Sequence, residues 1–358
     1  MSTTTTIVEP AVGQLSLQGG SEKPAPYKYE RFLPNYSTTL KLPPLEPFEH
    51  VDPGHQALKD PQPQSFLEGA NIKHVTPNFG TEIVDGVDLT KLGDRERAQI
   101  ALYVAQRGFV VLRNQQNFVD AEPQWQIYDW GQHFGRIHIH PVSGQPKDYP
   151  EFHLVHRDAT STTDERAYEG RLNKVTLHTD VSYELQPPGL TTLFLYETPP
   201  SGGDTLFIST TEAYNRLSPS FREYLETLEV VHSGLEQAAR SAALHGADTI
   251  KRQPVKHAHP LVRRHPVTGE KSLYVNPGFS RYIVGLKQEE SDAILNLLYS
   301  HLLAGHDFSA RARWGEPGTV VLWDNRVTTH SAIVDWGNGI TGMRHGARIT
   351  PQAERPFL

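Results

Sequence analysis

The chain has 358 residues, 37% of them hydrophobic, which is enough for one large catalytic domain with an N-terminal extension. Its 41 acidic and 34 basic side chains give a net charge of −7, so a cationic face for nucleic acid is not expected. It contains no cysteine, which excludes a disulfide framework, a thiolate metal site and a cysteine nucleophile. Histidine and carboxylate side chains are therefore the good metal ligands that remain.

The start of the chain gives no sign of export or of a membrane segment. No basic segment followed by an apolar run begins the sequence, and no stretch approaches eighteen consecutive apolar residues. We therefore expect a cytoplasmic protein without a membrane partner. The sequon Asn35-Tyr36-Ser37 is then expected to be a chance match, because glycosylation requires secretion.

Residues 1–71 are interpreted as a Pro-rich N-terminal extension. Prolines recur between Pro24 and Pro63, and no convincing apolar period accompanies them. An extended arm or a partly disordered tail is predicted. It would lie on the surface of its own chain or wrap a neighbouring subunit, which leaves a homo-oligomer open.

Residues 72–358 are predicted to form a single domain in which short strands alternate with helices. Helices are expected over 94–108, about 120–134, from Ser218-Pro219 onward and over 287–303. Strands are expected over 82–89 (with a turn), 109–112, 193–196, 205–208, 261–264, 272–275 and 319–323, and 267–270 is the turn of a hairpin. Many short, turn-bounded strands favour a closed or double-sheet β architecture of the jelly-roll kind, with helices outside.

Three His-x-Asp pairs occur, as chance allows with 18 histidines and 41 acidic residues. His50/Asp52 falls in the Pro-rich extension, where solvated polar residues are the expected interpretation. His156-Arg157-Asp158 copies the kinase catalytic-loop triplet, but none of the other kinase motifs accompanies it. Neither pair is expected to bind a metal.

The third pair, His178/Asp180, lies in a different setting. Residues 174–177 are predicted to form a strand, and residues i and i+2 of a strand project from the same face. His330 follows the apolar strand 319–323 and is placed to complete the cluster. Two imidazoles and one carboxylate on one face of an iron ion leave the other face open, which indicates an oxygen-using enzyme.

Four segments, in order and spacing, resemble the taurine/2-oxoglutarate dioxygenase (TauD/TfdA-like) family. They are His178-Thr179-Asp180, Ser201-Gly202-Gly203-Asp204-Thr205, residues 323–330 and Arg344-His345-Gly346-Ala347-Arg348. The Pro-rich extension is similar to that of the family's fungal sulfonate-oxidising branch. The resemblance covers about residues 72–358 and implies a mainly β, cupin-like double-stranded β-helix with flanking α-helices. It also implies Fe(II), 2-oxoglutarate and O2.

The resemblance also implies roles for eight residues. His178, Asp180 and His330 would be the iron ligands, Arg344 and Thr205 would bind the distal carboxylate of 2-oxoglutarate, His140 and Arg348 would bind a substrate sulfonate, and Phe279 would be an apolar wall. The chemistry agrees, because a planar guanidinium binds a carboxylate through two parallel hydrogen bonds.

Three features depart from the pattern of the taurine enzymes. Ser143 stands where those enzymes have a tyrosine, and Leu177 stands where a tryptophan usually precedes the His-x-Asp pair. The loop between His330 and Arg344 is longer than usual. Iron and co-substrate binding are still expected, but taurine itself does not follow as the substrate.

Three functions are compatible with these motifs. The first is oxidation of a C–H bond in a small anionic substrate, an alkylsulfonate such as taurine. The second keeps the cofactors but hydroxylates, desaturates or cyclises a small amino acid in a biosynthetic pathway. The third is a non-catalytic jelly-roll protein that binds a metal or ligand. Arg344 and Thr205 disfavour the non-catalytic protein, because a metal with a purely structural role needs neither residue.

Overall fold

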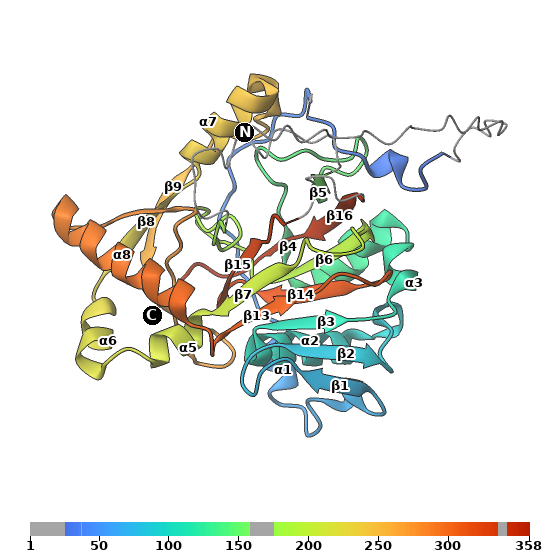
Figure 1. The fold of residues 1–358 in the computed structure, drawn as a ribbon, viewed down its shortest axis with the longest axis horizontal. Helices are drawn as coiled ribbons and strands as arrows, with labels where there is room; N and C mark the ends of the chain where they lie inside the picture. Colours follow the sequence, from blue (N-terminus) through green and yellow to red (C-terminus); the bar gives the residue numbers. More distant parts are fainter. Residues whose placement is uncertain (1–25, 37, 158–174, 336–341) are drawn as a thin grey trace, which may run out of the picture. The chain divides into compact units, whose positions relative to one another are not determined.

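The structure is a computed structural model that describes residues 26–36, 38–157, 175–335 and 342–358 (Figure 1). Arg31–Leu358 form one compact unit, and Met1–Glu30 form a separate one. Asp158, Lys174 and most of the long loop before Arg344, with its Gly337-Asn338-Gly339 segment, lie outside the described residues.

The largest sheet has seven strands. Their order across the sheet is β1 (Asn71–His74), β2 (Thr81–Asp85), β3 (Phe109–Leu112), β14 (Val320–Asp324), β6 (Leu190–Glu197), β16 (Arg344–Ile349) and β5 (His153–Arg157). Neighbouring strands are antiparallel except for β2 and β3, which are parallel. The helix α2 (Asp94–Arg107) lies behind β3 and β14 in Figure 1.

A second sheet of three strands packs on the large one. It consists of β13 (Ser309–Ala312), β7 (Thr205–Ser209) and β15 (Thr328–Ala332), with β7 in the middle. The ring of Phe207 on β7 stacks on Phe109 of the large sheet at 4.6 Å and lies 5.6 Å from the ring of Trp323. The predicted double-sheet, mainly β architecture is confirmed, since an aromatic core joins the two sheets.

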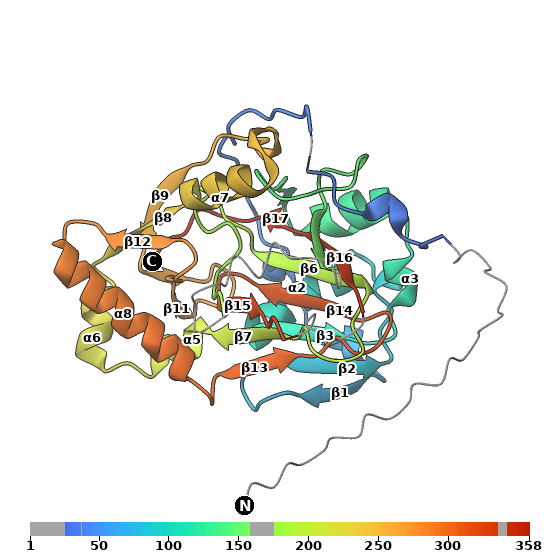
Figure 2. The ribbon, with the colours of Figure 1, turned by 45° about the horizontal axis from the view of Figure 1, so that its top comes forward.

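Smaller sheets and helices flank this sandwich, as Figure 2 shows. The remaining strands are β8 (Glu229–Ser233), β9 (Lys256–Pro260) and β12 (Ser280–Ile283) in one sheet, β10 (Val262–Arg264) with β11 (Lys271–Leu273), and β4 (Arg136–Ile137) with β17 (Pro351–Gln352). The remaining α-helices are α1 (Gly54–Ala57), α3 (Gln116–Val119), α5 (Thr210–Asn215), α6 (Pro219–Leu225), α7 (Leu235–His245) and α8 (Gln288–Ala304). None of the helices in the described residues combines the length and apolar character needed to cross a bilayer.

Several local predictions are confirmed, because at these positions the local sequence signal and the tertiary fold favour the same element. The helix predicted over 287–303 is α8, the helix opening at Ser218-Pro219 is α6 with proline at its first position, and the hairpin around residues 267–270 joins β10 to β11. The helix α2 also matches its predicted span. Its N-cap is Gly93 instead of Asp94, and the Glu96 carboxylate accepts a hydrogen bond from the Gly93 amide at 3.0 Å.

The helix expected over about 120–134 is confirmed, although its hydrogen-bond pattern is not that of a regular α-helix. Residues 123–134 are helical without interruption, and they include a π-helical segment η4 (Trp125–Trp130) and a 3-10 turn η5 (Gly131–Phe134) that ends before Gly135. Pro123 begins this segment, at a position where no intrahelical amide donor is needed.

One local prediction is wrong. The described residues 175–177 are not a strand, and the amide of Thr176 donates to the side-chain hydroxyl of Ser331 at 2.9 Å.

The described part of the N-terminal extension after Glu30 belongs to the same compact unit as the sheets. Asn35 pairs with Gln145, and the amide of Leu42 donates to the carbonyl of Lys251 at 2.7 Å. Residues 38–52 are without helix or strand, as an extended arm predicts. The boundary between residues 71 and 72 stays a prediction.

Candidate active site

The backbone brings His178 and His330 together. Their amides and carbonyls exchange two hydrogen bonds of 2.9 Å, although His178 lies outside any regular strand and His330 is the central residue of β15. This isolated antiparallel pair sets the two imidazole rings side by side, with centroids 4.4 Å apart. Main-chain hydrogen bonds thus bring together two histidines that are far apart in the sequence.

Asp180 is held by a turn that follows His178. Its amide donates to the side-chain carbonyl of Asn325 at 3.1 Å, and the hydroxyl of Thr179 donates to the carbonyl of Thr328 at 3.2 Å. The next residue, Val181, has φ of 37°, a conformation that a β-branched residue rarely adopts. Such strain concentrates at functional sites, where surrounding contacts hold the backbone in place.

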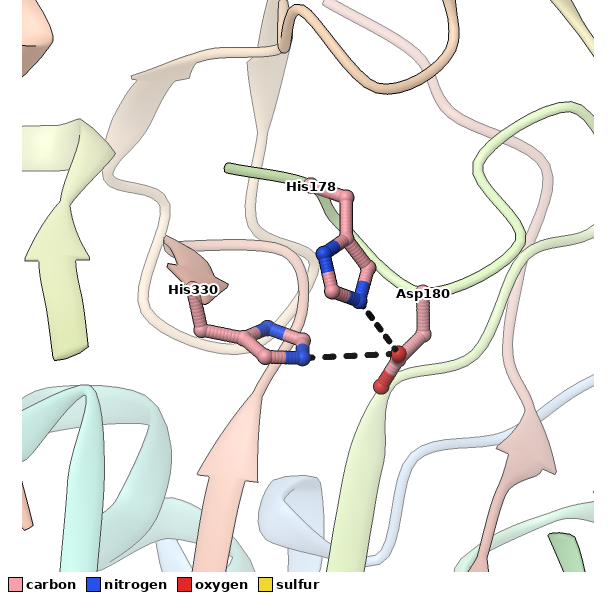
Figure 3. A group of neighbouring side chains, drawn as sticks. All are labelled: His178, Asp180 and His330. Carbon is pink, nitrogen blue, oxygen red and sulfur yellow. Dashed lines mark ion pairs between the residues drawn. The ribbon is translucent and has the colours of Figure 1, made fainter. Parts of the chain in front are cut away.

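The three side chains converge on one point (Figure 3). The Oδ1 atom of Asp180 lies 3.7 Å from Nε2 of His178 and 3.5 Å from Nε2 of His330. The three groups each offer one ligand atom, and these atoms lie within 4.8 Å of one another. Within the described residues, no other group of three or more His, Asp or Glu side chains meets this geometry.

The hydrogen bonds around the cluster suit a bound cation. Nδ1 of His178 donates to the carbonyl of Thr176 at 2.9 Å, which leaves the lone pair on Nε2, facing Asp180. Oδ2 of Asp180 is buried and accepts no hydrogen bond from the part of the chain that the structure describes. A buried carboxylate oxygen without a donor is costly, and a divalent metal ion would compensate it. The residues therefore fit the iron that the sequence implies.

Burial and neighbouring charges keep these groups in the protonation states that a metal requires. Burial, with the nearby His330, lowers the pKa of His178 to about 4, so its imidazole is neutral at pH 7. Burial alone would raise the pKa of Asp180, but the guanidinium of Arg348 and the two imidazoles hold it below its usual value. The cluster thus offers a neutral imidazole at His178 and a carboxylate at Asp180.

Arg344 and Thr205 form a second polar group. Arg344 is buried at the start of β16, with its guanidinium 5.6 Å from the centre of the Trp314 ring and its Nε donating to the carbonyl of Gly203 at 3.2 Å. Burial lowers its pKa to about 10, and Asp204 opposes this only in part. Nε1 of Trp314 donates to Oγ1 of Thr205 at 3.1 Å, so the Thr205 hydroxyl keeps its hydrogen for another acceptor. A buried cation beside a hydroxyl donor suits a carboxylate ligand.

His140 and Arg348 form a third polar group. Nδ1 of His140 accepts from the amides of Val142 at 3.2 Å and Ser143 at 3.1 Å, so in the neutral ring the hydrogen is on Nε2. Burial, with nearby cations, lowers the pKa of His140 well below its ordinary value. Arg348 lies four residues after Arg344 on β16, and its Nη1 contacts Oδ1 of Asp180 at 2.5 Å. Nε of Arg348 is buried and has no acceptor among the described residues.

Phe279, the residue predicted to be an apolar wall, lies beside the cluster. Phe279 is buried, and its ring lies edge-on to His178 with centroids 6.2 Å apart. Tyr183 packs against Phe279 at 5.0 Å, and the Tyr183 hydroxyl donates to the side chain of Gln237. Phe279 thus contacts both the candidate metal ligand and a hydrogen-bonded tyrosine.

All eight residues predicted for the site line one cavity of about 260 Å³. The structure brings together the candidate iron ligands, the candidate co-substrate residues and the candidate substrate residues: His178, Asp180, His330, Thr205, Arg344, His140, Arg348 and Phe279. Their individual roles stay predictions. Sequence reasoning missed His153 and Gln237 in the lining and Trp314 behind Thr205, because no local signal separates them from other polar or aromatic residues.

The other two His-x-Asp pairs lie elsewhere. Asp52 was expected to be solvated, but it is buried and pairs with Arg326 at 2.5 Å. It does so because the extension lies against the segment between β14 and β15. His156 packs near His345 and does not line the cavity, and its partner Asp158 lies outside the described residues.

Comparison with known proteins gives consistent matches. Residues 71–350 match the family described as taurine catabolism dioxygenase TauD, TfdA family. The chain is 46% identical over 332 residues to a Saccharomyces cerevisiae protein named alpha-ketoglutarate-dependent sulfonate dioxygenase, covering 92% of this chain and 79% of that protein. It is 40% identical to the Penicillium expansum alpha-ketoglutarate-dependent dioxygenase cnsM, covering 92% of this chain and 90% of the other.

A solved structure shares the fold. It is described as a putative alpha-ketoglutarate-dependent taurine dioxygenase from Burkholderia xenovorans, with a TM-score of 0.65 and 28% identity. The match covers 80% of this chain and 94% of that one. The predicted cupin-like jelly roll is therefore confirmed by structural similarity as well as by the two packed sheets.

Proposed function

The chain belongs to the taurine catabolism dioxygenase TauD, TfdA family, and from this membership we propose that it oxidises a C–H bond of an alkylsulfonate. It is a non-haem dioxygenase that depends on Fe(II), 2-oxoglutarate and O2. The observation that supports the proposal is that His140 and Arg348 line the same cavity as the His-Asp-His cluster, where they could bind an anion.

In this proposal His178, Asp180 and His330 hold the iron, and Arg344 with Thr205 binds the distal carboxylate of 2-oxoglutarate. Iron held there would supply the oxidising chemistry, together with O2 and 2-oxoglutarate. The protein residues supply position, and a displacement of about 1 Å can cost about a hundredfold in rate.

The substrate end of the cavity offers donors for an anion. A sulfonate has three acceptor oxygens and no donor, which matches the Nε2 hydrogen of His140 and the buried Nε hydrogen of Arg348. Phe279 provides an apolar surface for the carbon chain beside His178. The carbon next to the sulfonate would thereby lie closest to the metal cluster.

The proposed reaction balances without a further reactant. Hydroxylation of the carbon next to the sulfonate consumes one O2 and converts one 2-oxoglutarate into succinate and carbon dioxide. The resulting 1-hydroxyalkanesulfonate breaks its carbon–sulfur bond, which leaves an aldehyde and sulfite. Succinate and sulfite should therefore appear in a ratio of one to one.

The experiment is an assay of the purified protein with Fe(II), 2-oxoglutarate and O2. Taurine, unsubstituted alkylsulfonates, alkyl sulfate esters and small amino acids are compared, with succinate and sulfite measured together. Stimulated succinate with equal sulfite is expected from at least one alkylsulfonate. Succinate stimulated by amino acids alone, without sulfite, would contradict the proposal and favour the biosynthetic alternative.

The cytoplasmic location and the homo-oligomer stay predictions. Microscopy of the tagged protein would test the location, and light scattering of the purified chain would test the oligomeric state. The non-catalytic alternative is not favoured, because the relatives are named as dioxygenases.

A further inference from the structure

A second cavity adjoins the first on the side of His178. It has a volume of about 500 Å³, and His178, Gln237 and Phe279 line both cavities. Among its other lining residues, Val175, Leu177 and Pro277 are apolar. The three shared residues thus separate an inner cavity at the metal cluster from an outer cavity beside it.

The inner cavity has little room for a large substrate. Its 260 Å³ lies just below the range of about 300–1,000 Å³ that is usual for small-molecule sites. Under the proposed function it must hold 2-oxoglutarate and the sulfonate end of the substrate. A longer substrate would therefore extend past Phe279 and Gln237 into the outer cavity.

Gln237 is fixed at the junction between the two cavities. Its Oε1 atom accepts a hydrogen bond from the hydroxyl of Tyr183 at 2.9 Å. Its amide nitrogen has no acceptor among the described residues, which leaves two hydrogens for a ligand. A polar group in the middle of an extended substrate would meet a donor there.

Two arginines, Arg240 and Arg281, are among the residues that line the outer cavity. Nε of Arg281 pairs with Oε1 of Glu236 at 2.9 Å, so these two charges offset each other. Arg240, about one helical turn after Gln237 on α7, is exposed. Arg240 pairs with no carboxylate in the described parts of the chain.

We propose that the outer cavity binds the distal end of an extended sulfonate that carries a second anionic group, with Arg240 facing that group. The inference rests on the proposed function and extends it from a reaction to a substrate class. It assigns Gln237 and Arg240 as residues that select the substrate. Neither holds the iron or 2-oxoglutarate.

The test compares three alkylsulfonates in the succinate assay: a short unsubstituted one, and two longer ones of equal length that end in a carboxylate or in its neutral amide. The wild-type KM should be lowest for the carboxylate. Arg240→Gln should raise the KM for the carboxylate by about three- to fivefold, the usual scale of an exposed ion pair, and leave the short sulfonate unchanged. Arg240→Lys should keep most of the preference.

A matched control separates contact from overall charge. Ala239→Glu also lowers the net charge by one, on the neighbouring exposed residue of α7 that does not line either cavity. It should change the KM for the carboxylate less than Arg240→Gln does. Equal effects of Arg240→Gln on all three compounds, or no effect, would overturn the outer subsite. Absence of turnover with every alkylsulfonate would overturn the proposed function itself.

A separate contact carries a second inference. His153 on β5 is the direct cross-strand partner of Arg348 on β16, and Nη2 of Arg348 donates to Nδ1 of His153 at 2.7 Å. The His153 ring also lies against His140, with centroids 4.4 Å apart and ring planes at 75°. His153 therefore contacts both residues that the proposed function assigns to the sulfonate.

The geometry assigns His153 as a positioning residue that fixes the Arg348 guanidinium. His153→Leu should raise the sulfonate KM several-fold, while kcat, the co-substrate KM and the iron content stay near wild type. His153→Gln, which keeps an acceptor, should recover part of the loss. His156→Leu on the same strand is the control. If the KM values for sulfonate and co-substrate rise together, or if Gln and Leu behave alike, the assignment is wrong.

Discussion

The two sides of the active-site cavity are built in different ways. The metal side, His178 with His330 and Asp180, is fixed by main-chain hydrogen bonds between His178 and His330 and by a turn bonded to Asn325. The anion side, His140 with His153 and Arg348, combines the strand pairing of His153 with Arg348 and side-chain contacts among all three residues.

The loop that carries His140 is held by both kinds of contact. Nζ of Lys251 donates to the carbonyl of Ser143 at 2.6 Å, and the main chain of Asn35 in the N-terminal extension pairs with that of Gln145. Main-chain bonds do not depend on which side chains surround them, whereas side-chain contacts change with a single substitution. Under the proposed function, a single substitution among the contacts of His140, His153 and Arg348 would alter substrate binding and leave the main-chain pairing of His178 with His330 in place.

Removal of a metal-side ligand should have the largest effect. His178→Ala should lose its iron and essentially all succinate formation, more than the roughly tenfold to hundredfold cost of changing a residue behind a ligand. Metal analysis and the succinate assay measure this. His156→Ala, from one of the rejected His-x-Asp pairs, should keep both. Wild-type turnover in His178→Ala would contradict the assignment of the metal side.

The second-largest effect is expected from loss of the contact between the extension and the segment that joins β14 to β15. Asp52→Ala removes a buried partner of Arg326, and such a loss costs about 3–5 kcal/mol when a charge is left unpaired. The lower end, about 3 kcal/mol, is expected, because Asp324 still pairs with Arg326. Denaturant unfolding measures the change.

The control for this stability effect is an exposed ion pair. Asp307 pairs with Arg216 at 2.7 Å on the surface, so Asp307→Ala should cost less than about 1 kcal/mol. If both variants were destabilised equally, the buried contact of the extension would contribute no more to stability than an exposed ion pair does.

Replacement of the co-substrate arginine should have a smaller, selective effect. Arg344→Lys loses the two-pronged geometry of the guanidinium and should raise the KM for the co-substrate 2-oxoglutarate about tenfold or more. The sulfonate KM should change little. Steady-state kinetics with each substrate varied in turn measures both, and an unchanged co-substrate KM would show that another group binds the keto acid.

The smallest effect is expected on the anion side. His140→Ala removes one neutral donor, which corresponds to about tenfold or less in the sulfonate KM. Iron content and the co-substrate KM should match wild type, in contrast to His178→Ala and Arg344→Lys. A variant that also loses iron would show that the two sides are not separable.

Strong local signals made part of the fold predictable. The apolar spacing of α8, the Ser-Pro start of α6 and the apolar runs of β3 and β14 are properties of neighbouring residues, and the structure contains each of these elements. The strand expected over 174–177 is absent from its described part, because what places His178 is a single bridge to His330 and not a strand of its own.

The sequence by itself determined which residue types could bind a metal and, through motif order, which eight side chains to expect in one site. Only the tertiary structure decided that they line one cavity and that Asp52 of the extension is buried against Arg326. It also decided that His153 lies opposite Arg348 on the adjacent strand. The physical reason is that these contacts join residues far apart in the chain. No local periodicity, cap or turn encodes them, since strand register and the packing of the sheets set which residues meet.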